Sequence, residues 1–327
     1  MKIFVTGAAG FIGAHLCDRL LEHGHLVCGL DLFDADDPPG WQLARLASAR
    51  DNSRFSFITG DVTDTTGLRA YLGSFRPDAL VHAAARKDLV WADREPSACQ
   101  HLHAGGVAAV LQIARQLKIP RAVLCSSAHV YGGSRRFPFS EEDPADHPLS
   151  VLGAALRAAE LHASAVCLQA PLSVTVLRVF SVYGPRQSPQ RFLPALCSAA
   201  ERRESMPIIG DDTVGRDMIH IDDVAEGIIK AIEQPSRFRI LNLGTGQTTT
   251  LAQVAEQVSW LSGAPFKRVH RPARPGELPN TYADMRLARE ALGFSPAVTG
   301  EEGVRRYWEW FKDRPEPFSV QAMGSSI

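Results

Sequence analysis

The amino-acid sequence predicts an α/β fold with a doubly wound parallel sheet and a smaller, discontinuous C-terminal domain. Over the first half of the 327 residues, short apolar runs alternate with helix-length amphipathic segments, as in repeated βαβ units. A glycine-rich turn separates the first apolar run from the first amphipathic segment, as in sheets that bind a ligand at their carboxyl edge. Beyond residue 183 the chain is richer in loops, with Pro and Gly gathered at 184–189 and 271–276.

The predicted strands and helices alternate in order along the chain. Strands are predicted at short apolar runs, and helices where apolar residues recur at helical spacing. Right-handed crossovers then make neighbouring strands parallel. The predicted strands are residues 2–6, 26–31, 55–60, 79–82, 122–126 and 174–179. The predicted helices are residues 11–23, 104–117 and 153–167, with weaker ones at 42–49 and 66–75. Residues 220–232 are helix-like and 240–243 strand-like, so we expect the chain to return once to the first domain.

Composition and charge exclude several classes of protein. With 35 basic and 36 acidic residues, the chain has no overall field that would attract nucleic acid or an anionic membrane. Its 45% hydrophobic and 22% charged residues are typical of a globular protein. The six cysteines lie far apart without a Cys-x-x-Cys pair, which predicts buried thiols in a reducing compartment. We therefore expect a cytoplasmic protein with no nucleic-acid or membrane partner.

The glycine-rich turn directly follows the first predicted strand. Residues 7–13 have the sequence GAAGFIG, with glycines at a G-x-x-G-x-x-G spacing. Glycine permits a tight turn and lets backbone N–H groups approach a pyrophosphate at the start of a helix. Such turns also use glycine for packing alone, so the acid at the end of the next strand is needed to support the assignment. The residues expected to hold a dinucleotide here are Gly7, Gly10, Phe11, Ile12 and Gly13.

That acid is Asp31, whose carboxylate is placed to accept hydrogen bonds from the ribose hydroxyls of a dinucleotide. A 2′-phosphate would be repelled, and the next cations, Arg45 and Arg50, are expected to lie well outside the turn. The sequence therefore predicts NAD in preference to NADP. Further contacts with NAD are expected after the third and fourth strands, from Asp61, Val62, Ala83, Ala84 and Ala85.

These motifs resemble those of the extended short-chain dehydrogenase/reductase family, the NAD-dependent nucleotide-sugar epimerases and dehydratases. The resemblance covers nearly the whole chain and implies a Rossmann domain that binds NAD and a smaller domain that binds the nucleotide sugar. The matching stretches are residues 6–13, 60–62, 76–85, 126–132, 182–187, 216–224, 242–246 and 274–277. We place the NAD-binding domain at residues 1–180 plus about 214–247, and the substrate domain at 181–213 plus 248–318.

The resemblance also implies residues that contact the substrate. Arg216 and Arg274 would bind the nucleotide diphosphate, since guanidinium groups bind phosphate bidentately. Glu277 takes the place of an acid that binds the nucleotide ribose, and Ser181 takes the place of an Asn that touches substrate phosphate. A homodimer is expected by resemblance, through the helices predicted at 104–117 and 153–167.

One motif of that family is missing. Its members transfer hydride with a Tyr-x-x-x-Lys pair, in which Lys lowers the pKa of the Tyr that removes a hydroxyl proton. Here Leu152 and Leu156 stand at the two positions, and none of the five tyrosines has Lys four residues later. Alcohol oxidation through a tyrosine is therefore excluded.

Three polar side chains remain as candidates for catalysis. Ser127 matches the family's Ser or Thr at a strand end, with helix capping as the alternative. His129 stands where the family's 4,6-dehydratases carry a basic Glu, with a hydrogen-bonded structural histidine as the alternative. Lys87 matches a position near the sugar and its phosphates, with a solvated loop lysine as the alternative. No metal site is predicted, because His101 and His103 do not share one face of a helix.

Two functions remain open from the sequence. The first is an NAD-dependent epimerase or dehydratase of a nucleotide-linked or related sugar, with a non-standard acid–base set in place of Tyr and Lys. The second is a non-catalytic NAD-binding pseudoenzyme or regulatory partner. Arg216, Arg274 and Glu277 favour the enzyme, whereas Leu152 and Leu156 favour the pseudoenzyme.

Overall fold

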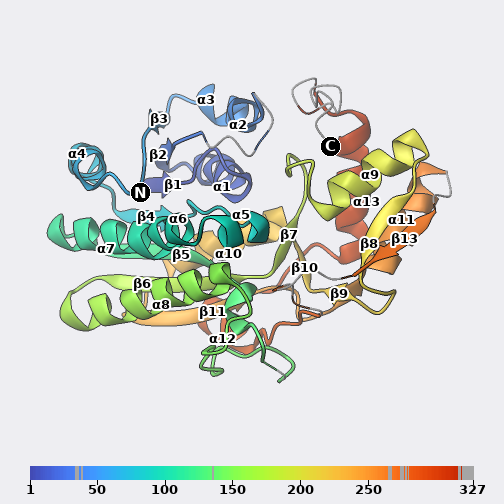
Figure 1. Ribbon diagram of the computed structural model, residues 1–327. Coiled ribbons are helices and arrows are strands. Elements are labelled where there is room, and N and C mark those ends of the chain that lie inside the picture. The colour runs from blue at the N-terminus through green and yellow to red at the C-terminus, as the bar shows by residue number, and fades with distance from the viewer. Residues whose placement is uncertain are drawn as a thin grey trace.

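A computed structural model describes residues 1–33, 37, 40–134, 136–263, 267–272, 276, 278, 280–315 and 318. A seven-stranded sheet in the order β11-β6-β5-β4-β1-β2-β3 lies at its centre, and every neighbouring pair in it is parallel (Figure 1). The strand order reverses between β1 and β4, which makes the sheet doubly wound as predicted. Its strands are β1 (Lys2–Thr6), β2 (Leu26–Asp31), β3 (Phe55–Thr59), β4 (Ala79–His82), β5 (Arg121–Ser127), β6 (Ser173–Val179) and β11 (Phe238–Leu243).

Helices cover both faces of the sheet because its side chains are apolar on both sides. Along β1, Ile3 and Val5 belong to one core cluster and Phe4 to the other, since successive strand residues point to opposite faces. The first face is covered by α1 (Phe11–Glu22) and α10 (Ile221–Glu233), and the second by α4 (Thr65–Phe75), α7 (Gly106–Gln116) and α8 (Val151–Gln169). Shorter helices connect or flank them: α2 (Trp41–Arg45), α3 (Ala47–Arg50), α5 (Leu89–Arg94), α6 (Pro96–Gln100), η1 (His101–Gly105), η2 (Ala128–Tyr131) and α12 (Arg286–Leu292).

A smaller assembly lies beside the carboxyl edge of the sheet, at the right of Figure 1. It has its own apolar core, which includes Leu196, Val258 and Tyr307. The parallel pair β7–β10 leads from the sheet toward it. Its elements are β7 (Ser181–Tyr183), α9 (Phe192–Arg202), β8 (Met206–Ile209), β9 (Gly215–Arg216), β10 (Met218–His220), β12 (Thr249–Thr250), α11 (Leu251–Ser262), β13 (Arg268–Arg271) and α13 (Gly300–Lys312). The proposed division of the chain into two discontinuous domains stays a prediction.

Two predicted helices differ in detail from those in the structure. Most of the helix expected at 104–117 is α7, and its first two residues belong to a π-helical turn, η1, that runs directly into α7. The helix expected at 42–49 is divided at Leu46, whose backbone N–H bonds Leu43 in a tight turn that ends α2. Hydrophobic spacing predicts that a helix exists but does not distinguish these changes of backbone winding.

Helix α8 is the one described helix that is long and apolar enough to cross a membrane, with a mean hydropathy of 1.4 in its most apolar window. Its side chains Leu152, Ala155 and Ala163 are buried in the core clusters of the fold. Core helices of α/β domains meet the same length and composition criterion, so this feature is weak evidence for a membrane span.

A buried ion pair joins α8 to the central sheet. Glu160 and Arg178 are each 1% exposed, with Arg178 Nη2 and Nε donating to the two carboxylate oxygens at 2.8 and 3.1 Å. Ser126 and Arg157 donate to the same carboxylate at 2.7 and 3.1 Å. Burial by itself lowers the pKa of Arg178, but the hydrogen bonds and charge of Glu160 outweigh it and raise that pKa, so the guanidinium stays charged.

We expect Glu160→Ala to lower the free energy of unfolding by about 3–5 kcal/mol, because it leaves the buried guanidinium of Arg178 without its counter-charge. Urea unfolding followed by circular dichroism measures this change. The matched control is Glu302→Ala, which removes a glutamate that binds Arg305 and Arg306 at the surface of α13 and should cost much less. Equal losses for the two variants would contradict the assigned role of the buried pair.

Candidate active site

The glycine-rich turn between β1 and α1 is pressed against the segment that follows β4. Gly7 has a φ of +72°, and a Cβ there would lie 2.5 Å from the backbone nitrogen of Ala84. A Cβ on Gly13 would lie 2.0 Å from the carbonyl oxygen of Gly7. Backbone atoms of neighbouring residues leave no room for a side chain at either position, so both must be glycine. The turn is therefore held close to the carboxyl edge, where strand order reverses.

The start of α1 is suited to an anion. Gly10 is its N-cap residue, and in the described part of the chain no side chain caps this end of the helix. Phe11 and Ile12 form its first turn, where backbone N–H groups have no partner within the helix. A pyrophosphate accepts hydrogen bonds from such groups, so the predicted residues of the turn fit NAD.

Asp31 ends β2 beside this turn, as the sequence predicts. Its carboxylate accepts hydrogen bonds from the backbone nitrogens of Ala9, at 2.8 Å, and Phe33, at 3.2 Å. Burial raises the pKa of Asp31, and these N–H groups counteract the rise by stabilising the charged form. The carboxylate is thus fixed at the strand end where a dinucleotide presents its ribose.

The expected position of Arg45 was wrong. Its side chain folds back to the turn, with Nη1 3.5 Å from the carbonyl oxygen of Ala9 and Nε donating to the carbonyl of Arg186 at 2.9 Å. The number of residues between Arg45 and the turn does not predict this approach, which arises because α2 packs against α1. The guanidinium is paired with Asp37, so its charge is already neutralised next to the turn.

The other predicted cofactor residues lie at the ends of β3 and β4. Asp61 accepts a hydrogen bond from the backbone nitrogen of Thr63 at 2.8 Å, and Val62 is buried in a core cluster. Ala83 donates its N–H to Thr6 of β1 at 3.0 Å, which fixes the start of the 83–85 segment beside the turn. Small side chains there leave the surface flat, and their contacts with NAD stay a prediction.

Leucines occupy the two positions of the missing motif and are packed into the protein. Leu152 is 0% and Leu156 4% exposed, both on α8. Leu156 lines a small cavity at the carboxyl ends of β4 and β5, together with His82, His103 and Glu160. Neither leucine can exchange a proton, so any proton transfer here uses other groups.

The two serines at the end of β5 have different partners. Ser126 donates to Glu160 and is part of the buried ion-pair network. Ser127 is the N-cap of η2 and accepts a hydrogen bond from the backbone nitrogen of His129 at 3.5 Å. Ser127 therefore caps η2, which was the alternative to a catalytic role. Its hydroxyl accepts this bond through the oxygen and still has a hydrogen to donate.

His129 is half-buried, and one of its ring nitrogens, Nδ1, is shielded from solvent without a structural hydrogen bond. Among the described residues and their contacts, Nδ1 of His129 has no partner. Burial lowers the pKa of His129 most, and together with the positive charges of Lys87, Arg216 and Arg191 it brings that pKa to about 4. The ring is therefore neutral at pH 7, and it differs from the fully hydrogen-bonded structural histidine that was the alternative.

Lys87 is held over the end of β5 and is not a freely solvated loop residue. Its Nζ donates to the carbonyl of Ser126 at 3.0 Å. The loop that carries it is fixed by two more bonds, from Arg191 to the Lys87 carbonyl at 3.2 Å and between His103 Nε2 and the Arg86 carbonyl at 3.1 Å. Burial lowers the pKa of Lys87, and the charge of Arg191 adds to that effect.

The substrate-side predictions are only partly covered by the structure. Ser181 begins β7, where its backbone nitrogen donates to the carbonyl of Asp217 at 3.0 Å. Arg216 lies on β9, and its charge acts on His129. Arg274 and Glu277 lie outside the described residues, so their predicted contacts with the nucleotide stay predictions.

Sequence reasoning missed two features of this site. Arg191 reaches the Lys87 loop from just before α9, and only a basic residue close after the Pro- and Gly-rich loop signals it. Glu160 and Arg178 were signalled more clearly, as opposite charges within an otherwise apolar helix and strand. Their pairing depends on how α8 packs against β6, which the pattern of either segment alone does not predict.

Comparison with known proteins identifies the family. The model of the NAD-dependent epimerase/dehydratase family matches residues 3–244. A probable UDP-glucuronate 4-epimerase of Rhizobium meliloti is 29% identical over 95% of this chain and 97% of its own. Among solved structures, the UDP-glucose 4-epimerase of Thermotoga maritima with UDP-glucose has a TM-score of 0.88 at 29% identity, covering 96% of this chain and 99% of its own. The UDP-glucuronic acid 4-epimerase of Bacillus cereus, in complex with UDP-glucuronic acid and NAD, has a TM-score of 0.87 at the same identity and coverage. The chain therefore belongs to the NAD-dependent epimerase/dehydratase family, whose enzymes use NAD as cofactor.

Proposed function

We propose that the protein is an NAD-dependent 4-epimerase of a nucleotide-linked sugar, with His129 as the proton acceptor in place of the missing tyrosine. The observation that carries this proposal is the half-buried, neutral imidazole of His129, whose Nδ1 has no structural hydrogen-bond partner beside the end of β5. The relatives that act at sugar position 4 support epimerisation over loss of water. Bound NAD would take a hydride from the sugar and return it.

His129 is suited to hold the proton of a sugar hydroxyl. The imidazole accepts that proton as the carbon loses its hydride, and returns it when the hydride comes back to the opposite face. A group with a pKa of about 4 is a weak base in the free protein. An anionic substrate beside Lys87, Arg191 and Arg216 would neutralise the charges that depress this pKa and so strengthen the base.

Ser127 and Lys87 complete the acid–base set. The Ser127 hydroxyl can donate to the oxygen of the sugar as its proton leaves, because its own oxygen already accepts from His129 N–H. The ammonium of Lys87, held by the Ser126 carbonyl, supplies positive charge that stabilises the same oxygen. Both residues lie outside α8, so their proposed roles do not require a polar side chain at Leu152 or Leu156.

The remaining proposals concern the substrate and the assembly. Arg216, with Arg274, would bind the diphosphate, and Ser181 a phosphate or sugar oxygen. A homodimer would use α7 and α8, whose surface leaves Leu161 and Leu168 56% and 74% exposed. A reducing, cytoplasmic setting is supported by six cysteines that are all free and buried.

Cofactor binding is expected to depend on Gly13. Gly13→Val places side-chain atoms against the carbonyl of Gly7 and should abolish NAD binding, because the turn cannot hold its shape. Isothermal titration with NAD measures the loss. Gly73→Ala on α4 is the control, since a Cβ there meets nothing within 4 Å. Tight NAD binding by the Gly13 variant would contradict the placement of the cofactor.

The catalytic role of His129 is tested with His129→Gln. Incubation with NAD and UDP-sugars, followed by NMR of the sugar, should show 4-epimer formation that falls about 10²–10⁴-fold in the variant. His147→Gln, at an exposed histidine, should keep full activity, and both variants should bind NAD. The double variant Leu152→Tyr/Leu156→Lys distinguishes an active enzyme from a pseudoenzyme. If this variant forms the 4-epimer and the natural chain does not, the proposal is overturned.

The pH dependence provides an independent check. His129 must be neutral to accept a proton, and its pKa of about 4 keeps it neutral throughout the ordinary range. We expect kcat/KM, which reports the free enzyme, to remain unchanged as pH falls through about 6.5, where an ordinary histidine would become charged. A decline centred near that ordinary value would show that the titrating base is not the buried His129.

A further inference from the structure

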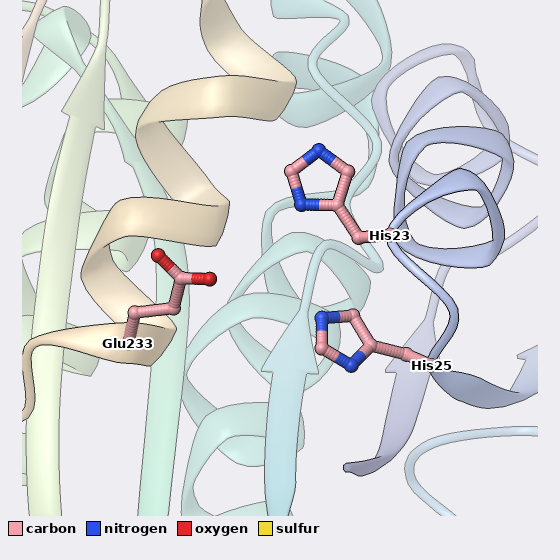
Figure 2. A group of neighbouring side chains, drawn as sticks. All are labelled: His23, His25 and Glu233. Atoms are coloured by element: carbon pink, nitrogen blue, oxygen red, sulfur yellow. The ribbon is translucent and has the colours of Figure 1, made fainter.

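We propose that His23, His25 and Glu233 form a binding site for a divalent transition-metal ion, for which Zn²⁺ is the probe. Their ligand atoms, two imidazole nitrogens and a carboxylate oxygen, all lie within 4.8 Å of one another. Figure 2 shows the two rings facing the carboxylate across a short gap. The site lies at the amino edge of the sheet, opposite the carboxyl edge that carries the candidate active site.

The backbone fixes the positions of these three side chains. His23 is the C-cap of α1, and its N–H donates to Arg19 at 3.0 Å. Gly24, with a φ of +77°, makes the turn into β2, and the N–H of His25 donates to Leu20 at 3.0 Å. Glu233 is the last residue of α10, which packs against α1. The ligands therefore come from three segments that the core of the fold already holds together.

The chemistry of the three donors suits such an ion. Imidazole and carboxylate groups bind Zn²⁺ and its first-row neighbours, at about 2.0–2.2 Å for Zn²⁺. Around a tetrahedral ion of this size ligand atoms lie about 3.3 Å apart, so the side chains must close in by roughly an ångström. His23 and Glu233 are exposed, so their rotamers are free to make that adjustment.

The helix ends at this site favour a cation. Both α1 and α10 end at this point, and the C-terminal ends of helices carry partial negative charge. The Nδ1 of His25 is 3.2 Å from the positively charged amino group of Met1, so the ion would bind at Nε2, the ring nitrogen farther from that charge. Two other histidines, His147 and His270, each lie beside a carboxylate, but neither belongs to a group of three donors among the described residues.

The experiment uses the full chain without an affinity tag, freed of metal with a chelator and titrated with Zn²⁺ in a calorimeter. We expect one saturable Zn²⁺ per chain and binding at least about tenfold weaker for Glu233→Gln. The double variant His23→Ala/His25→Ala should lose saturable binding. His147→Ala is the matched control and should bind as the natural chain does. Unchanged NAD binding in every variant would show that each is folded.

Thermal stability provides a second readout of Zn²⁺ binding. Binding to the folded state alone stabilises it, so Zn²⁺ should raise the Tm of the natural chain and leave that of the double variant unchanged. Absence of saturable binding in the natural chain, or equal binding by the double variant, would overturn the proposal. Neither result would bear on the proposed epimerase activity, which involves the opposite edge of the sheet.

Discussion

The buried pair of Glu160 and Arg178 is the interaction on which the candidate active site depends. It lies under the carboxyl edge of the sheet and links α8 to β6 by two hydrogen bonds. The guanidinium also lies over the ring of Tyr131, whose hydroxyl donates to Asn242 of β11 at 2.6 Å. Because an unpaired charge is so costly in a protein interior, these elements can settle in only one relative position.

The same ion-pair network positions the polar groups at the end of β5. Ser126 is committed to Glu160, so its carbonyl is held where Lys87 can donate to it. The next residue, Ser127, begins the tight turn that carries His129. The catalytic groups proposed here are thus placed by a structural network beneath them, and α8 contributes to that network even though it has lost the tyrosine and lysine of its family.

Leucine at both positions makes this part of α8 apolar and uncharged. Leu152 and Leu156 belong to the apolar core, and α8 packs against β5. Without a lysine there, the positive charge near the end of β5 comes from Lys87 and Arg191, on loops outside the helix. The cofactor turn is unaffected, because its geometry depends on backbone contacts between residues 7–13 and 83–84.

The sequence by itself determined the parallel sheet, the glycine turn, the acid after β2 and the absence of Tyr and Lys. These features are local: hydrophobic period, glycine spacing and residue identity at a motif are all visible within a short stretch of chain. The tertiary structure alone decided that Arg45 returns to the turn, that Nδ1 of His129 is buried without a structural hydrogen bond, and that His23, His25 and Glu233 meet. Burial and contacts between distant segments set these properties, and no local pattern encodes them.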